Sequence, residues 1–460
     1  MSDVLFQYEK VNPTSWAYLS SILALALFFK FNRLFSIRNV DLLMLILLAP
    51  GLLLVQFGLE NLGSESFALD SQRLGFTWLF AVGAVWLARL LADVSLVRRP
   101  LLPPNLNESG LLFLGGALLF FLMTNVVTGK ASSGGGDQAQ TPAESEAKER
   151  QGERGGAFET EGPGYWLVYL MPRITTQRLI GGGRAATSET AAQRAEQRLR
   201  VREAASRAVA IASNMLIVAG MIVVGTRHFD NPSAGVASAT MYLLTPYTAL
   251  WTGSVPHALP AALLVWAVAC YRRPLAAGLL VGLASGTIYY PMFLLPLWCS
   301  FYWDRGVKRF VTGVLITLSV LVATLAMTAG SLDLFLQGLT QMFGIRTPPT
   351  QNLGGVWQFW PPIYRLPILA LFVALAFSFA GWPNRKHLGT LISCSAGVML
   401  AAQFWHAHGG GLYIAWYLPL LLLTVYRPNL EDRVAATMVD EGWWQRRRRL
   451  SREPAPTPAA

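Results

Sequence analysis

Residues 40–59, VDLLMLILLAPGLLLVQFGL, decide the fold class of this chain. The stretch holds a single charged residue, Asp41, and a helix needs about 20 predominantly apolar residues to cross the hydrocarbon core of a bilayer. Lipid offers no hydrogen-bond partners, so a spanning segment must satisfy its backbone groups internally, as an α-helix does. The stretch therefore predicts a transmembrane helix.

Apolar stretches of this kind recur along the chain. The clear ones are 15–30, 40–59, 74–92, 110–128, 208–225, 309–329, 363–381, 388–404 and 411–426. The region 235–303 is also apolar, and breaks at 253–257, 271–274 and 289–291 divide it into four segments. Its prolines predict kinks or re-entrant pieces that neighbouring helices shield from lipid. We therefore expect an all-α, polytopic membrane bundle of about 13 transmembrane helices.

The composition agrees with this fold class. Hydrophobic residues make up 53% of the 460 residues and charged residues 14%, against about 25% charged in soluble domains. The net charge of +11 comes from short loops and from the tail at 443–452, WWQRRRRLSR. Basic residues in such places contact anionic headgroups. Membrane lipids are therefore the expected partners, and nucleic acid is not.

The distribution of lysine and arginine orients the bundle. If the spans alternate in direction, most basic residues of the short loops lie on one side, among them Lys30, Arg33, Arg38, Arg98, Arg99, Arg272, Arg273 and Lys308. The opposite loops hold few, namely Lys10, Arg73 and Arg346. Cytoplasmic loops carry the excess of basic residues. We therefore expect an external N-terminus and a cytoplasmic C-terminus.

The chain divides into four parts. An N-terminal membrane block of about four helices covers 1–128, and a C-terminal block of about nine covers 208–427. Between them, 129–207 begins with a Gly-, Ser- and charge-rich stretch that cannot bury enough apolar surface to fold. It continues with an amphipathic piece and a charged helix that runs into the span at 208. We place this polar insert outside the membrane, and residues 428–460 form a basic cytoplasmic tail.

Few ionisable residues lie inside the predicted spans. Arg89 and Asp93 are four residues apart, the spacing of an ion pair on one helix face. Cys270, Cys299 and Cys394 show no pairing or metal-ligand spacing and are expected to be free thiols. No metal site and no cofactor are predicted.

The loops on the outer side contain the residues from which a binding site can be built. The carboxylates are Glu60, Glu65 and Asp70, and the other polar or aromatic candidates are His257, Arg346, Trp357, Trp360, His406, His408 and Tyr413. Aromatic rings pack on sugar faces, arginine matches phosphate geometry, and a carboxylate can deprotonate a hydroxyl group. The alternative is that the tryptophans form only an interfacial belt and that the Pro- and Gly-rich stretches only shape the loops.

Residues 235–310 carry a resemblance to a known family. They contain TPY at 245–247, YRRP at 271–274, AGLLVGLAS at 277–285, YYP at 289–291 and FYWDRGVKRF at 301–310. This pattern resembles membrane glycosyltransferases of the GT-C class, especially the polyprenyl-phosphate-mannose-dependent mannosyltransferases. The end of the C-terminal block, GGGLYIAWYLPLLLLTVYRPNL at 409–430, is similar to the last span of that class. The resemblance covers about residues 208–430.

The resemblance implies a hexosyltransferase that takes a sugar from a polyprenyl-phosphate donor at the outer face of a bacterial inner membrane. Such enzymes place an acidic catalytic residue in the first extracytoplasmic loop, which follows their first span. The corresponding loop here, 59–73, follows the second span, and its candidates are Glu60, Glu65 and Asp70. Tyr290 precedes Pro291 where the family often has a lysine, and it is a candidate substrate-binding residue.

Two other functions stay open. The Pro- and Gly-interrupted segments between 235 and 303 are typical of the broken helices of transporters and lipid flippases, although the two halves show no internal repeat. A non-catalytic membrane scaffold is the other reading, in which the insert at 129–207 and the basic tail recruit partners.

Overall fold

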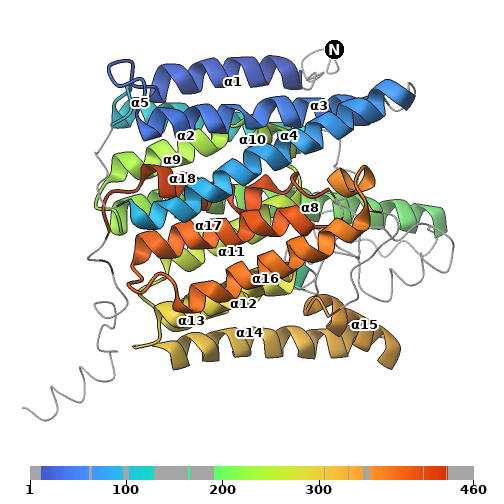
Figure 1. Ribbon diagram of the computed structural model, residues 1–460. Coiled ribbons are helices and arrows are strands. Elements are labelled where there is room, and N and C mark those ends of the chain that lie inside the picture. The colour runs from blue at the N-terminus through green and yellow to red at the C-terminus, as the bar shows by residue number, and fades with distance from the viewer. Residues whose placement is uncertain are drawn as a thin grey trace, which may run out of the picture.

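The computed structural model describes residues 12–61, 65–96, 103–128, 164–165, 191–304, 306–329, 331–345, 353–407, 409–430 and 433. Over these ranges the chain is helical and contains no β-strand, which confirms the predicted all-α class. The helices lie side by side with their axes roughly parallel, with α1 and α14 at opposite edges (Figure 1).

The helices follow the apolar stretches of the sequence. In the N-terminal block they are α1 (Pro13–Phe28), α2 (Ile37–Ile46), α3 (Leu48–Glu60), α4 (Glu65–Ala92), the 3₁₀ turn η1 (Asp93–Ser95) and α5 (Glu108–Thr128). The next helices are α8 (Ala191–Arg227), α9 (Pro232–Leu244), α10 (Pro246–Trp251), α11 (Val255–Ala269), α12 (Pro274–Thr287), η3 (Tyr290–Leu294) and α13 (Leu295–Phe301). The last are α14 (Val307–Thr328), α15 (Leu332–Met342), η4 (Gly355–Gln358), η5 (Pro362–Tyr364), α16 (Arg365–Gly381), α17 (Leu388–Trp405), η6 (Ile414–Trp416) and α18 (Leu418–Tyr426).

Seven helical segments of the described chain are long and apolar enough to cross a membrane. They are Ile37–Glu60, Ser66–Ser95, Glu108–Thr128, Glu203–Arg227, Val307–Met327, Pro362–Gly381 and Leu388–Trp405. Four shorter apolar helices accompany them, at Pro13–Phe28, Val255–Ala269, Pro274–Thr287 and Tyr290–Phe301. The chain is thus a multi-pass membrane protein by length and composition, and the total of 13 spans stays a prediction.

The stretch 411–426 differs from the continuous helix that its hydrophobicity predicts. Only Leu418–Tyr426 is α-helical, and a single 3₁₀ turn, Ile414–Trp416, precedes it. Gly409 and Gly411 adopt positive φ angles of 65° and 93°, a backbone region that glycine reaches without steric cost. The glycines therefore form a loop where the pattern of hydrophobicity alone predicts a span.

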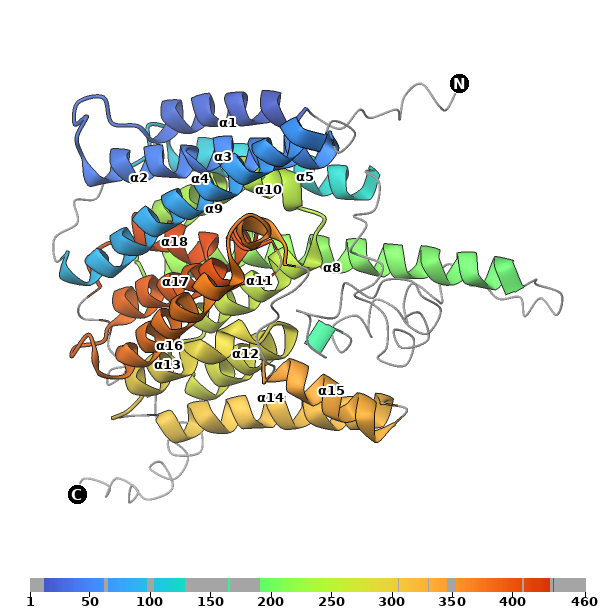
Figure 2. The ribbon, with the colours of Figure 1, turned by 45° about the vertical axis from the view of Figure 1, so that its right-hand side comes forward.

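Helix α8 confirms the charged helix that runs into a membrane span. It is continuous from Ala191 to Arg227, and its apolar part, Glu203–Arg227, is one of the seven spanning segments. Its N-terminal half projects beyond the other helices (Figure 2). The rest of the predicted insert, 129–163 and 166–190, lies outside the described residues.

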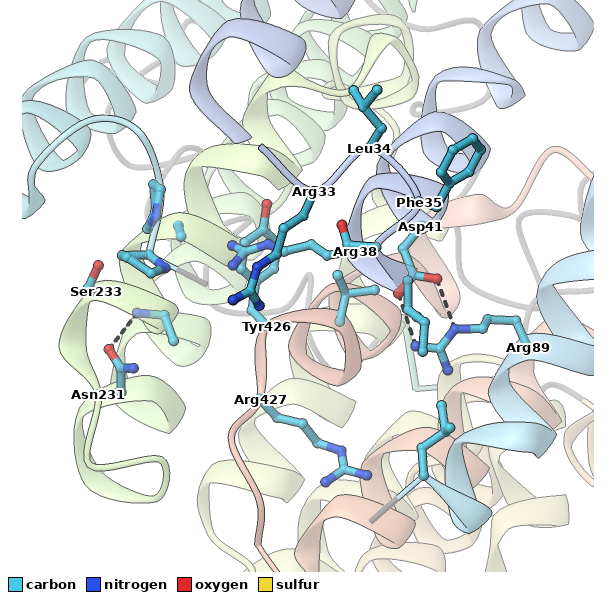
Figure 3. Close-up of a pocket in the computed structure, with 18 residues that line it drawn as sticks. Arg33, Leu34, Phe35, Arg38, Asp41, Arg89, Asn231, Ser233, Tyr426 and Arg427 are labelled. Carbon is cyan, nitrogen blue, oxygen red and sulfur yellow. Dashed lines mark hydrogen bonds and ion pairs between the residues drawn. The ribbon is translucent and has the colours of Figure 1, made fainter. Parts of the chain in front are cut away.

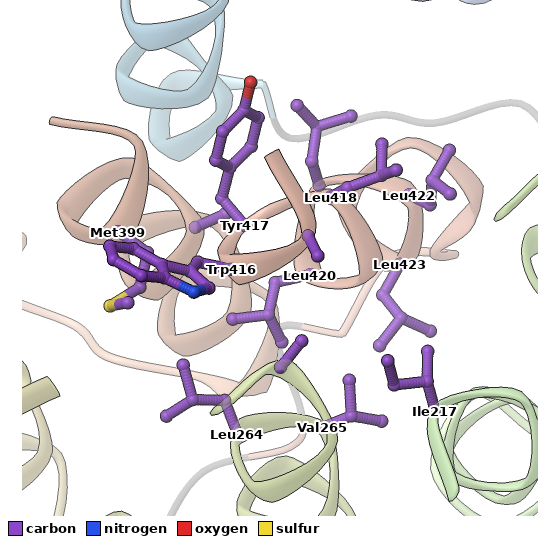
Figure 4. Packing of buried hydrophobic residues seen from close by; sticks show 14 of the residues in the cluster. Ile217, Leu264, Val265, Met399, Trp416, Tyr417, Leu418, Leu420, Leu422 and Leu423 are labelled. Carbon is purple, nitrogen blue, oxygen red and sulfur yellow. The ribbon is translucent and has the colours of Figure 1, made fainter. Parts of the chain in front are cut away.

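The two predicted membrane blocks pack into one hydrophobic core. Helix α4 contacts α17, α5 contacts α9, and α1 contacts α10, so helices of the two blocks pack directly against each other. Helix α18 lies near the centre, where Ile217 of α8 and Val265 of α11 face Leu423 (Figure 4). All three of these side chains are fully buried. The blocks are therefore separate in sequence but not in the fold.

Glycines bring α12 and α14 into very close contact. Gly278, Gly282 and Gly286 recur at every fourth position of α12 and so share one face of that helix. A Cβ atom on Gly278 would lie 2.1 Å from the carbonyl oxygen of Phe310, and one on Gly313 would lie 2.3 Å from that of Leu275. Small residues allow such close backbone approach where lipid removes the hydrophobic driving force between helices.

A buried ionic network ties α2, α4 and α18 together. Arg89 pairs with Asp93 at 3.0 Å, which confirms the ion pair predicted from their spacing. Arg89 also donates two hydrogen bonds to Asp41 of α2, at 2.8 and 3.0 Å. Arg427, directly after α18, pairs with the second oxygen of Asp93 at 2.7 Å. Asp41 and Asp93 are almost fully buried. The carboxylate of Asp93 joins two cations from distant parts of the chain.

Candidate functional site

Four of the predicted site residues converge in the structure. The ring of Tyr413 stacks on that of His257, with 4.6 Å between centroids, and lies 4.8 Å from the ring of His406. The ring of His406 lies 5.4 Å from that of Tyr290. These side chains come from the first turn of α11, from η3 and from the loop between α17 and α18. Residues as far apart in the sequence as 257 and 413 thus form one histidine–aromatic cluster.

Further aromatic rings enclose the two imidazoles. Trp251 stacks on His257 at 4.5 Å with its ring nearly parallel. The hydroxyl group of Tyr247 lies 2.5 Å from Nδ1 of His257. On the other side, Trp416 stacks on Tyr413 at 4.4 Å. The cluster therefore consists of aromatic rings packed on one another, with the polar atoms of histidine and tyrosine at the ring edges.

The loop that carries His406 and Tyr413 is held in place by a glutamine. Oε1 of Gln403, on the last turn of α17, accepts hydrogen bonds from the backbone N–H groups of Gly411 and Tyr413 at 3.2 and 3.3 Å. Nε1 of Trp416 donates to the carbonyl oxygen of Pro256 at 2.8 Å. The loop is thereby fixed against the start of α11, the helix that carries His257.

Arg365 adds a cation beside the cluster. It is the first residue of α16 and is only 3% exposed. Its Nε and Nη2 atoms donate hydrogen bonds to the carbonyl oxygen of Trp405 at 3.3 and 3.0 Å. The ring of Trp405 packs edge-on against that of Tyr290 at 5.6 Å. Arginine is the side chain whose planar geometry matches a phosphate group.

Of the two predicted tryptophans, the structure places Trp357 beside the last turn of α17. Trp357 of η4 is buried, packs against Phe80 at 6.3 Å and donates to the carbonyl oxygen of Phe404 at 3.2 Å. Trp360 is 46% exposed. Arg346 and His408 lie outside the described residues.

The predicted catalytic carboxylates are not part of the cluster. Glu60 ends α3, is exposed, and accepts a hydrogen bond from Gln56 at 2.6 Å. Asp70 is exposed on α4, and of Glu65 the structure describes only the backbone, at the start of that helix. Helix α4 meets the loop of the cluster at Phe80, and ten residues separate it from Asp70, which is about 15 Å along the helix. The assignment of these carboxylates as the catalytic base stays a prediction.

Four residues of this site are not among those predicted from the sequence, namely Arg365, Tyr247, Trp251 and Trp416. One available signal is that Arg365 stands at the start of an apolar span, in PPIYRLP, where an ionisable residue is expensive and often functional. A second is that Tyr247 belongs to the TPY element that carries part of the family resemblance. The tryptophans have no such signal, because interfacial and site tryptophans look alike in sequence.

Comparison with known proteins gives no match: no family model, no curated protein and no solved structure matches this chain. The resemblance to the GT-C class therefore stays a prediction from the sequence motifs.

Proposed function

We propose that the protein is a membrane glycosyltransferase that takes a sugar from a polyprenyl-phosphate donor. The observation that carries this proposal is the convergence of His257, Tyr290, His406 and Tyr413 in one cluster next to Arg365. Aromatic side chains are common in sugar sites, and a guanidinium group suits the donor phosphate. The motifs of 235–310 support the same reaction class.

In the proposed reaction, a hydroxyl oxygen of the acceptor attacks the anomeric carbon of the donor sugar. The bond between that carbon and the phosphate oxygen breaks, and polyprenyl phosphate leaves with the bonding electrons. A base takes the proton of the acceptor hydroxyl. The resemblance implies Glu60, Glu65 or Asp70 as this base, whereas the geometry favours the imidazole of His257, which Tyr247 orients through Nδ1.

The proposal includes the finer topology. We infer about 13 spans, an external N-terminus and a cytoplasmic basic tail, with the cluster on the outer side of a bacterial inner membrane. The excess of basic residues in one set of short loops supports this orientation. Membrane lipids and the polyprenyl-phosphate donor are the partners that it implies.

Sugar transfer by the purified protein in lipid vesicles tests the proposal. We expect wild-type protein to transfer labelled hexose from a polyprenyl-phosphate donor to a lipid acceptor. Replacement of His257 with glutamine removes the titratable ring, and we expect the rate to fall about 100-fold, the lower end for loss of a general base. Tyr18→Ala removes an exposed tyrosine of α1 and is the control that keeps the rate.

The same assay decides which group is the base. Retention of transfer in a Glu60→Ala, Glu65→Ala, Asp70→Ala variant excludes the carboxylates. A normal rate in His257→Gln with loss in the triple variant returns the role to them. The proposed function itself is rejected if wild-type protein transfers no sugar from any polyprenyl-phosphate hexose to any acceptor lipid supplied.

A transporter is the second candidate function, and the interrupted helices favour it. Helix α9 ends at Leu244 and α10 begins at Pro246, while the 3₁₀ turn η3 separates α12 from α13. Broken helices of this kind line the substrate sites of many transporters. Uptake of labelled solutes into sealed vesicles, without any sugar transfer, would favour this function.

A further inference from the structure

A cavity of about 760 Å³ opens at the opposite end of the bundle from the histidine–aromatic cluster. It lies where the loop at 29–36, the residues 103–104 and the ends of α9 and α18 meet (Figure 3). Helix α9 begins beside this cavity and ends next to α10, which carries Tyr247 and Trp251 of the cluster. The cavity has the size of a small-molecule site and is separate from the site of the proposed function.

Four arginines line this cavity, and they differ in their partners. Arg89 and Arg427 pair with the buried carboxylates Asp41 and Asp93. Arg33 and Arg38 form no ion pair with a carboxylate anywhere in the described chain. The guanidinium group of Arg38 lies over the ring of Tyr426, 4.6 Å from its centroid, and its Nε is buried without a hydrogen-bond partner. The cavity therefore carries uncompensated positive charge.

A lysine lies in the same basic loop as Arg33. Lys30 lies in the loop at 29–36, and its Nζ donates to Asn105 at 2.8 Å. Burial lowers the pKa of Lys30 below its ordinary value, and the positive charge of Arg38 lowers it further. The potential around the cavity thus favours an anion.

The loop beside the cavity is apolar as well as basic. Phe35 is 97% exposed, Phe31 71%, Leu34 56% and Ile37 53%. Leu34, Phe35 and Ile37 belong to the cavity lining. Large apolar side chains gathered at an exposed loop are characteristic of surfaces that contact partners or membrane, and next to arginines they suit the boundary between headgroups and acyl chains.

We propose that this cavity binds the phosphate group of an anionic phospholipid, with Arg33 and Arg38 on the phosphate and the acyl chains against Leu34, Phe35 and Ile37. Basic pockets between transmembrane helices are able to hold anionic headgroups. The apolar rim selects a lipid as the source of the phosphate, because free phosphate has nothing to place against these side chains.

Binding of phosphatidylglycerol to the full-length protein tests this inference. We expect the protein in nanodiscs to retain phosphatidylglycerol over phosphatidylcholine when native mass spectrometry counts the bound lipids. Arg33→Gln, which changes an exposed side chain without a carboxylate partner, should weaken retention about fivefold, and Arg33→Gln with Arg38→Gln about 30-fold. Lys308→Gln with Arg309→Gln removes two exposed cations of α14 outside the cavity and should leave retention unchanged.

Several outcomes would overturn the inference. One is equal retention of the two lipids by wild-type protein. Another is an equal loss in the α14 control pair, which would indicate only a general attraction of the basic face. A third is displacement of the lipid by inorganic phosphate at the same concentration, which would make free phosphate the ligand. Arg33→Gln alone keeps the test valid if the double variant fails to fold.

Discussion

Replacement of Asp93 with asparagine is expected to destabilise the protein by about 3–5 kcal/mol. The carboxylate of Asp93 accepts from Arg89 at 3.0 Å and from Arg427 at 2.7 Å and is buried. Asparagine keeps the shape but removes the charge, so Arg427 loses the carboxylate that neutralises it inside the bundle. Chemical denaturation in mixed micelles, followed by tryptophan fluorescence, measures the loss.

The matched control for this prediction is Asp230→Asn. Asp230 also pairs with an arginine, Arg433, but its side chain is 68% exposed, and exposed pairs contribute about 0–1 kcal/mol. Asparagine also tolerates the positive φ of 49° at this position. A loss in Asp93→Asn no larger than that in Asp230→Asn would mean that the network does not hold α4 and α18 together.

Replacement of Gly278 with leucine is the second large effect, with an expected loss of about 3 kcal/mol, the upper part of the range for overpacked cores. The added side chain meets the backbone of α14, because a Cβ atom there lies 2.1 Å from the carbonyl oxygen of Phe310. Backbone cannot rotate away as a side chain can, so α12 and α14 must separate. The same denaturation measurement applies.

Gly116→Leu is the control for the glycine substitution. Gly116 lies inside α5, and nothing lies within 4 Å of a Cβ atom there. Leucine is the better helix former, so this variant should gain up to about 1 kcal/mol. Equal losses in both variants would show that helical glycines, and not the contact of α12 with α14, determine the stability.

The periodicity and the hydrophobicity of the sequence predict the local structure well. The ion pair of Arg89 and Asp93 depends only on helical spacing, and the charged start of α8 continues into its span because no helix breaker separates them. The prediction of a continuous helix over 411–426 is wrong for an equally local reason. The conformations of Gly409 and Gly411 override the hydrophobicity of the residues after them.

The contacts between distant segments are what the sequence cannot specify. Asp41 pairs with Arg89 across 48 residues of sequence, and Arg427 pairs with Asp93 across 334. In the same way, His257 and Tyr413 are predicted on one face of the membrane, but their stacking follows from how the loop after α17 packs on α11. The topology therefore predicts which residues share a face of the membrane, whereas the packing of the helices and loops determines which of them are in contact.

The most direct test of the proposed function is to map where a polyprenyl-phosphate donor binds. A photoreactive polyprenyl-phosphate hexose, crosslinked to the full-length protein in vesicles and mapped by peptide mass spectrometry, reports the residues in contact with it. We predict labelled peptides that contain His257 and the loop from His406 to Tyr413, with labelling suppressed by unmodified donor. Labelling confined to the lipid-exposed surface, or unaffected by unmodified donor, would contradict this prediction.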